Sequence, residues 1–179
     1  MICLCGAATR PNVAPNVIYT ATGVFNATPV SGKDLFRLAG HEFNMSVTAN
    51  EALVAPVHGA QWAMYKQLSM IGTVQSGLLP TPIAISNNAT NILLAAGNPN
   101  QDILQIGTPV KVVGLTITIT AVITMPKGTI VNDHIWPFTQ PVSMTPGNAR
   151  VTYVYTDSTG TNSTVLSVQQ GTMSTRLTW

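Results

Sequence analysis

Apolar and polar residues alternate along most of the chain, and this period of two is typical of half-buried β-strands. The clearest stretch runs from Val110 to Met125. Leu115, Ile117, Ile119, Ala121 and Ile123 share one face there, whereas Thr116, Thr118, Thr120 and Thr124 occupy much of the other. We therefore expect one long strand over 110–125 with a single buried face.

The same alternation predicts further short strands separated by Gly, Pro and Asn turns. The stretch from Gly59 to Gly72 also fits helical spacing loosely, and its context favours a strand. Between Pro29 and Gly40, a Ser or Asp cap and a terminal Gly predict a short helical connector. The other expected strands are 16–25, 41–48, 53–57, 83–86, 91–96, 130–137, 150–156, 162–168 and 173–179, with a hairpin loop at 157–160.

About eight to ten strands with almost no helix predict an all-β fold, specifically a single antiparallel β-sandwich or jelly-roll barrel. The chain has 179 residues, which is enough for one core without staples. No internal repeat or linker divides it. We expect residues 1–15, which include Pro11 and Pro15, to form an extended N-terminal arm before a barrel domain over 16–179.

The composition changes the picture of the surface. Only 8% of the residues are charged, about a third of the usual share, and Thr, Asn, Ser, Gln and Pro take their place. The eight cations are scattered, so the clustered phosphate contacts of specific nucleic-acid binding are not expected. A surface poor in Lys and Glu resembles the composition of protein interfaces and favours association.

The N-terminus and the cysteines add little chemistry. The first residues of the chain lack the basic and apolar regions of a signal peptide. No apolar run approaches the roughly 20 residues of a transmembrane helix. Cys3 and Cys5 can be free thiols, a strained pair or links between chains. Two thiolates make half of a tetrahedral zinc site, and nothing nearby completes it.

Candidate catalytic groups are few. His41-Glu42 and Asp133-His134 are adjacent pairs, but successive residues of a strand point to opposite faces. His41, His58 and His134 could form a cupin-type metal site, although no H-x-H pair anchors it. No motif of hydrolases, nucleotide enzymes or zincins occurs. We therefore expect no enzyme activity, no cofactor and no metal.

A neutral chain rich in Thr, Asn and Pro, with many strands, an arm and a final strand ending in Trp179, resembles viral jelly-roll capsid proteins. Its length is similar to that of the small single-barrel major capsid protein of tailless, internal-membrane icosahedral phages. The resemblance implies a virion location, dimers or larger homo-oligomers, packing beside a second capsid protein, and an internal viral membrane nearby. Candidate arm or interface residues are Cys3, Cys5, Trp62, Trp136 and Trp179.

Two other functions fit the sequence. A carbohydrate- or receptor-binding β-sandwich, such as a phage spike or fibre head, would use Trp62 or Trp136 to stack on sugar rings. A cupin-type enzyme would bind metal through its histidines.

Overall fold

The computed structural model describes residues 16–50, 57–59, 62–96, 99–112, 114–130 and 140–178, with backbone alone for 57–59. These residues form strands and connections and contain no helix, so none of them belongs to a membrane-spanning helix. The strands are β1 (Asn16–Phe25), β2 (Glu42–Ala49), β3 (Val57–Gly59), β4 (Trp62–Val74), β5 (Ile83–Ala95), β6 (Gln101–Val112), β7 (Leu115–Pro126), β8 (Val142–Met144), β9 (Ala149–Asp157) and β10 (Gly160–Thr178).

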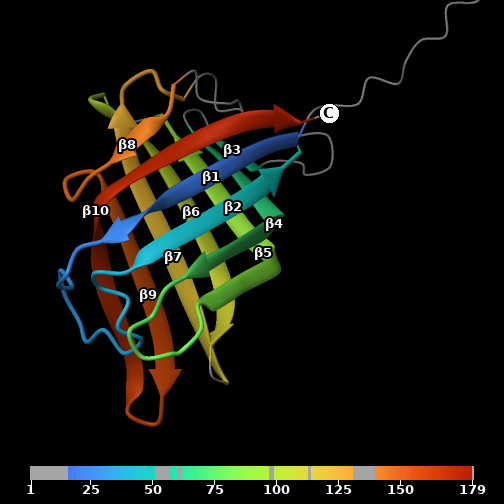
Figure 1. Ribbon diagram of the computed structural model, residues 1–179. Coiled ribbons are helices and arrows are strands. Elements are labelled where there is room, and N and C mark those ends of the chain that lie inside the picture. Colours follow the sequence, from blue (N-terminus) through green and yellow to red (C-terminus); the bar gives the residue numbers. More distant parts are fainter. Residues whose placement is uncertain are drawn as a thin grey trace, which may run out of the picture.

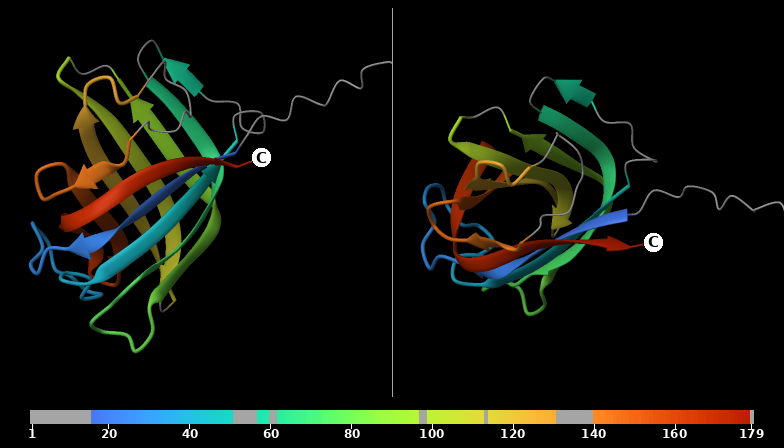
Figure 2. Two further views of the ribbon diagram at one scale, coloured as in Figure 1. Left: turned by 45° about the horizontal axis from the view of Figure 1, so that its top comes forward. Right: turned by 90° about the horizontal axis from the view of Figure 1, so that it is seen from above.

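Eight of these strands form a closed antiparallel barrel. They follow one another in the order β1-β2-β4-β5-β6-β7-β9-β10, and β10 returns to pair with β1 (Figure 1). The short strands β3 and β8 pair with β4 and β10. Seen from above, the strands make a ring (Figure 2). The all-β and barrel parts of the sequence prediction are therefore confirmed.

The jelly-roll connectivity is not confirmed. A jelly roll joins its strands by Greek-key crossovers, whereas neighbours in this barrel are also neighbours along the chain. Alternation within a strand reports which face is buried but not which strand lies beside it, and therefore the sequence pattern did not distinguish the two arrangements.

Three strand predictions need correction. The expected strand over 110–125 is a hairpin, because β6 ends at Val112 and β7 begins at Leu115. Gly114 lies between them with a positive φ of 81°, which suits a turn. Strands 83–86 and 91–96 are one bulged strand, β5. Strands 162–168 and 173–179 are likewise one strand, β10, which continues to Thr178 and pairs with β1 of the same chain. The expected N-terminal arm, 1–15, lies outside the described residues.

The hydrophobic core fills the inside of the barrel. On the eight barrel strands the apolar members of the alternation mostly point inward, as Tyr19 and Ala21 do on β1 and Ile117 and Ile119 on β7. Aromatic pairs add to the core, such as Phe25 and Phe43, whose ring centroids lie 4.7 Å apart. The outward members are Thr, Ser, Asn and Gln for the most part, so the barrel has a mainly apolar inside and a polar outside with few charges.

The connection from β1 to β2, residues 26–41, closes one end of the barrel. It forms turns, not the expected helical connector. Phe36 and Leu38 are buried, and the Phe36 ring lies 5.6 Å from Tyr153 and 6.3 Å from Tyr155. We call this connection the plug.

Two glycines let β1 and β10 approach each other where the barrel closes. Gly23 and Gly171 are paired across the two strands. A Cβ on Gly23 would lie 2.7 Å from the carbonyl oxygen of Gln170 and 3.0 Å from the Cα of Gly171, both backbone atoms. Because backbone cannot turn aside as a side chain can, no larger residue fits without moving a strand.

Gly23→Ala therefore destabilises the protein, and we expect a loss of about 1–3 kcal/mol in the free energy of unfolding from overpacking. Gly107→Ala is the matched control on β6, because a Cβ there meets no atom within 4 Å. Urea unfolding of both variants measures the difference. Equal stability of the two variants would show that the close approach does not constrain closure.

Candidate functional site

The barrel interior is the first place to look for a ligand site. Its cavity measures about 20 Å³. Sites for small molecules occupy about 300–1,000 Å³, and a cavity this small has room for about one water. The lining is almost entirely apolar, so a water would find few partners. The described side chains around this cavity are therefore packed core, and the cavity itself is too small for a ligand.

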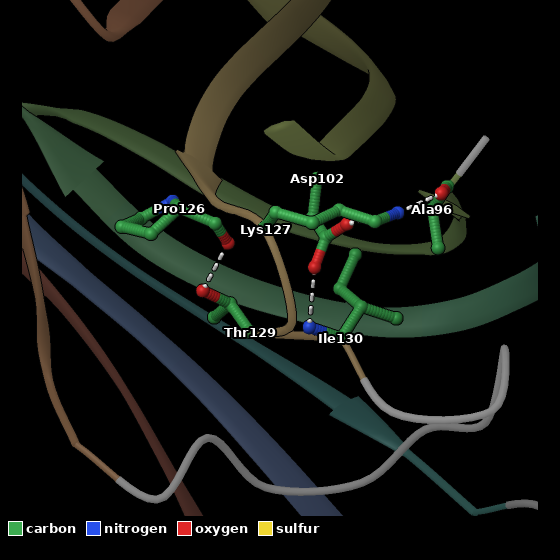
Figure 3. A network of polar contacts seen from close by, with 6 residues as sticks. All are labelled: Ala96, Asp102, Pro126, Lys127, Thr129 and Ile130. Atoms are coloured by element: carbon green, nitrogen blue, oxygen red, sulfur yellow. Dashed lines mark hydrogen bonds and ion pairs between the residues drawn. The ribbon is translucent and has the colours of Figure 1, made fainter. Parts of the chain in front are cut away.

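A buried carboxylate near the other end of the barrel is the second candidate. Asp102, on β6, is fully buried, and its Oδ2 accepts a hydrogen bond from the Ile130 amide at 2.9 Å. Its Oδ1 lies 3.2 Å from Nζ of Lys127, which also donates to the carbonyl of Ala96 (Figure 3). Both oxygens are thus occupied, and the pair ties the segment after β7 to β6. We interpret it as a structural clamp.

The plug contains the third polar cluster. Tyr153 donates to Oδ1 of Asp34 at 2.9 Å, and Oδ2 of Asp34 accepts from the Ala39 amide at 2.8 Å. Thr164 donates to the Lys33 carbonyl at 2.6 Å. Burial raises the pKa of Tyr153 well above its ordinary value, and the neighbouring Asp34 adds to the rise. A phenol that holds its proton so firmly is a poor proton donor, and the phenolate that could act as a base is not populated near neutral pH. The cluster therefore anchors the plug to β9 and β10.

The raised pKa of Tyr153 makes stability depend on alkaline pH. The folded state keeps the phenol neutral, whereas the unfolded chain loses the proton near pH 10. The stabilisation that the neutral Tyr153 phenol contributes to the free energy of unfolding is therefore complete below about pH 10. It decreases by about 1.4 kcal/mol per pH unit as the pH rises above that value. The free energy of unfolding of Tyr153→Phe should therefore decrease less steeply between about pH 10.5 and 12 than that of the natural protein. Chemical unfolding over this range tests it, and parallel curves for the two proteins would contradict the assignment.

The histidine and carboxylate pairs of the sequence form no metal or catalytic cluster among the described residues. No group of three His, Cys, Asp or Glu able to hold a metal is found there. His41 is half-buried before β2, and the next residue, Glu42, is exposed at its start. Asp133, His134 and the side chain of His58 lie outside the described residues, so the cupin-type site stays a hypothesis.

Of the candidate interface residues, only Trp62 is described. It begins β4, where it pairs with Gly59 of β3, and its side chain is 37% exposed. Cys3, Cys5, Trp136 and Trp179 lie outside the described residues.

The outer wall over β10, β1, β2 and β4 is a surface that the sequence analysis did not define. Two rows of outward residues cross these four strands, and neither row contains a charged side chain. We call them the hydroxyl face. Its first row is Thr172, Thr22, Asn44 and Thr73, and its second is Ser174, Thr20, Ser46 and Ile71.

Ile71 stands out within the hydroxyl face because its side chain is apolar and 62% exposed. Across the sheet it is opposite Ser46 on β2 and Ser86 on β5. The hydroxyls of Thr20 and Ser46 lie 3.2 Å apart, so neighbouring polar groups already share hydrogen bonds within the face. The result is a sheet surface with an apolar side chain at its β4 edge and no charged side chain within its two rows.

A second surface feature lies where β5 and β6 separate. These strands pair only from Asn91–Gly107 to Ala95–Ile103. Over Ile83–Asn87, β5 pairs with β4 alone, and over 108–112, β6 pairs with β7 alone (Figure 1). We call this opening the seam. It forms a cleft of about 420 Å³ lined by Ala84, Ser86, Asn87, Pro109, Val110, Lys111 and Thr116.

Comparison of the chain with protein-family models, curated proteins and solved structures found no match. The barrel, its hydroxyl face and its seam are therefore the features from which a function can be inferred.

Proposed function

We propose that the protein is a structural subunit that assembles with copies of itself through its outer wall. The observation that carries the proposal is the hydroxyl face, an uncharged sheet surface on a barrel whose interior is filled. Binding inside the barrel would need space that the packed side chains occupy. A barrel of this kind offers partners its outside.

The hydroxyl face suits association on energetic grounds. Burying a charged side chain at an interface costs free energy unless it is paired, and the two rows contain none. Their Ser, Thr and Asn side chains can exchange hydrogen bonds with water for hydrogen bonds with a partner. Ile71 adds an apolar group whose burial contributes about 1.5–3 kcal/mol.

In its specific form, the proposal makes the protein a capsid subunit of an icosahedral virion. Copies of this chain, and a second capsid protein beside them, would cover the polar wall, and an internal viral membrane would lie near the shell. The closed barrel suits this role because it is a rigid unit that packs through its outer surface. No specific contact with nucleic acid is part of the proposal, since the cations are scattered along the chain.

Light scattering after size exclusion, over a wide concentration range and at two salt concentrations, tests the proposal. We expect a molar mass of at least a dimer that increases with concentration. Salt should change it little, because charges contribute little to the contact. A single-chain mass at every concentration would contradict self-assembly.

Ile71→Lys tests the face itself. Losing the apolar contact and burying a charge should weaken association by roughly tenfold or more, as measured by analytical ultracentrifugation. Leu78→Lys is the matched control, because Leu78 is 51% exposed in the connection between β4 and β5, away from the face. Equal weakening by both substitutions would indicate a general effect of charge.

A second candidate is a carbohydrate- or receptor-binding module. The exposed Trp62 favours it, since an indole ring open to solvent can stack on a sugar. Sugar-dependent quenching of tryptophan fluorescence that Trp62→Ala abolishes would support this function over assembly.

A further inference from the structure

Among the strands that the structure describes, none lies beside the two edges that the seam leaves on β5 and β6. Paired strands satisfy their backbone N–H and C=O groups on both sides, and an edge that lacks a partner is a template for another strand. Five residues of β5, Ile83–Asn87, face five residues of β6, 108–112, in this way. The opening therefore suits one short extended segment.

Asn87 bridges the two strands at the end of the seam nearest to the paired part of β5 and β6. Its side-chain amide donates to Oγ1 of Thr108 at 2.6 Å and to the carbonyl of Pro109 at 2.9 Å. Pro109 has no N–H to donate to a neighbouring strand, and the Asn87 amide occupies its carbonyl, so both features disfavour pairing of β5 with β6 at this position. The separation is thus specified by side chains at the point where pairing stops.

The floor and the rim of the seam differ in character. Ile83, Ile85 and Val110 are buried beneath it and keep the barrel core closed. Ala84, Ser86, Pro109 and Thr116 are exposed along its rim, and Lys111 is the one charged residue that lines it. An added strand would therefore meet mostly small side chains beside Lys111, and backbone that is open to it except at Pro109, whose carbonyl already accepts from Asn87.

We propose that the seam binds residues 2–6 of a second copy of this chain, which adds to the sheet as a strand. This inference rests on the proposed self-assembly, which brings neighbouring copies against the outer wall. Each described strand already belongs to its own barrel sheet, so an added strand has to come from outside the described ranges. Among those stretches, residues 51–56 and 131–139 contain charged residues and proline.

Residues 1–9 have the composition that the seam requires. They contain no charge and no proline, so they add no buried ion and can donate every backbone N–H after the first. In an extended strand, Ile2 and Leu4 share one face, and Cys3 and Cys5 share the other. The nine residues 7–15 can span up to roughly 30 Å between that strand and β1, enough to cross from one copy to its neighbour.

The two natural cysteines make the proposal testable in the full-length chain. Ser86→Cys places a thiol on the exposed rim of the seam, and mild oxidation then traps a segment that binds there. We expect a covalent dimer on a non-reducing gel, roughly tenfold more abundant than with Thr156→Cys, an equally outward position on β9. Replacing Cys3 and Cys5 with Ser should abolish it.

The outcomes separate this inference from the proposed function. An oligomer in light scattering without the Ser86→Cys dimer would overturn the seam as the binding site and leave self-assembly intact. A cross-link within one chain would overturn the second copy as the source of the strand. A single-chain mass at every concentration would instead overturn the proposed function on which the inference rests.

Discussion

The pairing of β10 with β1 is the constraint on which the rest of the structure depends, because it turns a row of strands into a closed barrel. It runs from Asn16–Thr178 to Phe25–Val168, with one bulge beside Phe25. Gly23 and Gly171 permit the close approach, because a Cβ on either would lie within 3 Å of a backbone carbonyl oxygen of the facing strand. Closure gives the inward apolar side chains a common core and pairs the strand edges that an open sheet would leave free, except along the seam between β5 and β6.

Closure also decides where function can reside. The inward side chains fill the barrel, the plug and the Asp102–Lys127 clamp secure its ends, and the remaining cavity is too small for a ligand. The outer wall then carries the features left for recognition. The hydroxyl face offers a surface without charge, and the seam offers backbone. Both suit a partner that is itself a protein strand or sheet.

Local pattern predicted much of this from the sequence. Alternation identified the inward faces of β1, β7 and β9, and the hairpin at 157–160, because burial on one side of a strand imposes a period of two. It did not reveal the turn at Gly114, where apolar residues continue on both sides, or the order of strands. The hydroxyl face and the seam depend on which strands lie side by side, so no single stretch of sequence could predict them.

Amide hydrogen exchange along the seam tests the account most directly. The account predicts that residues 83–87 of β5 and 110–111 of β6 exchange more slowly in concentrated, assembled protein than in dilute single chains. Residues 117–123 of β7, paired on both sides within the barrel, should exchange alike in both samples. Seam amides that exchange equally fast in assembled and dilute protein would contradict the claim that a strand from a neighbouring copy adds there.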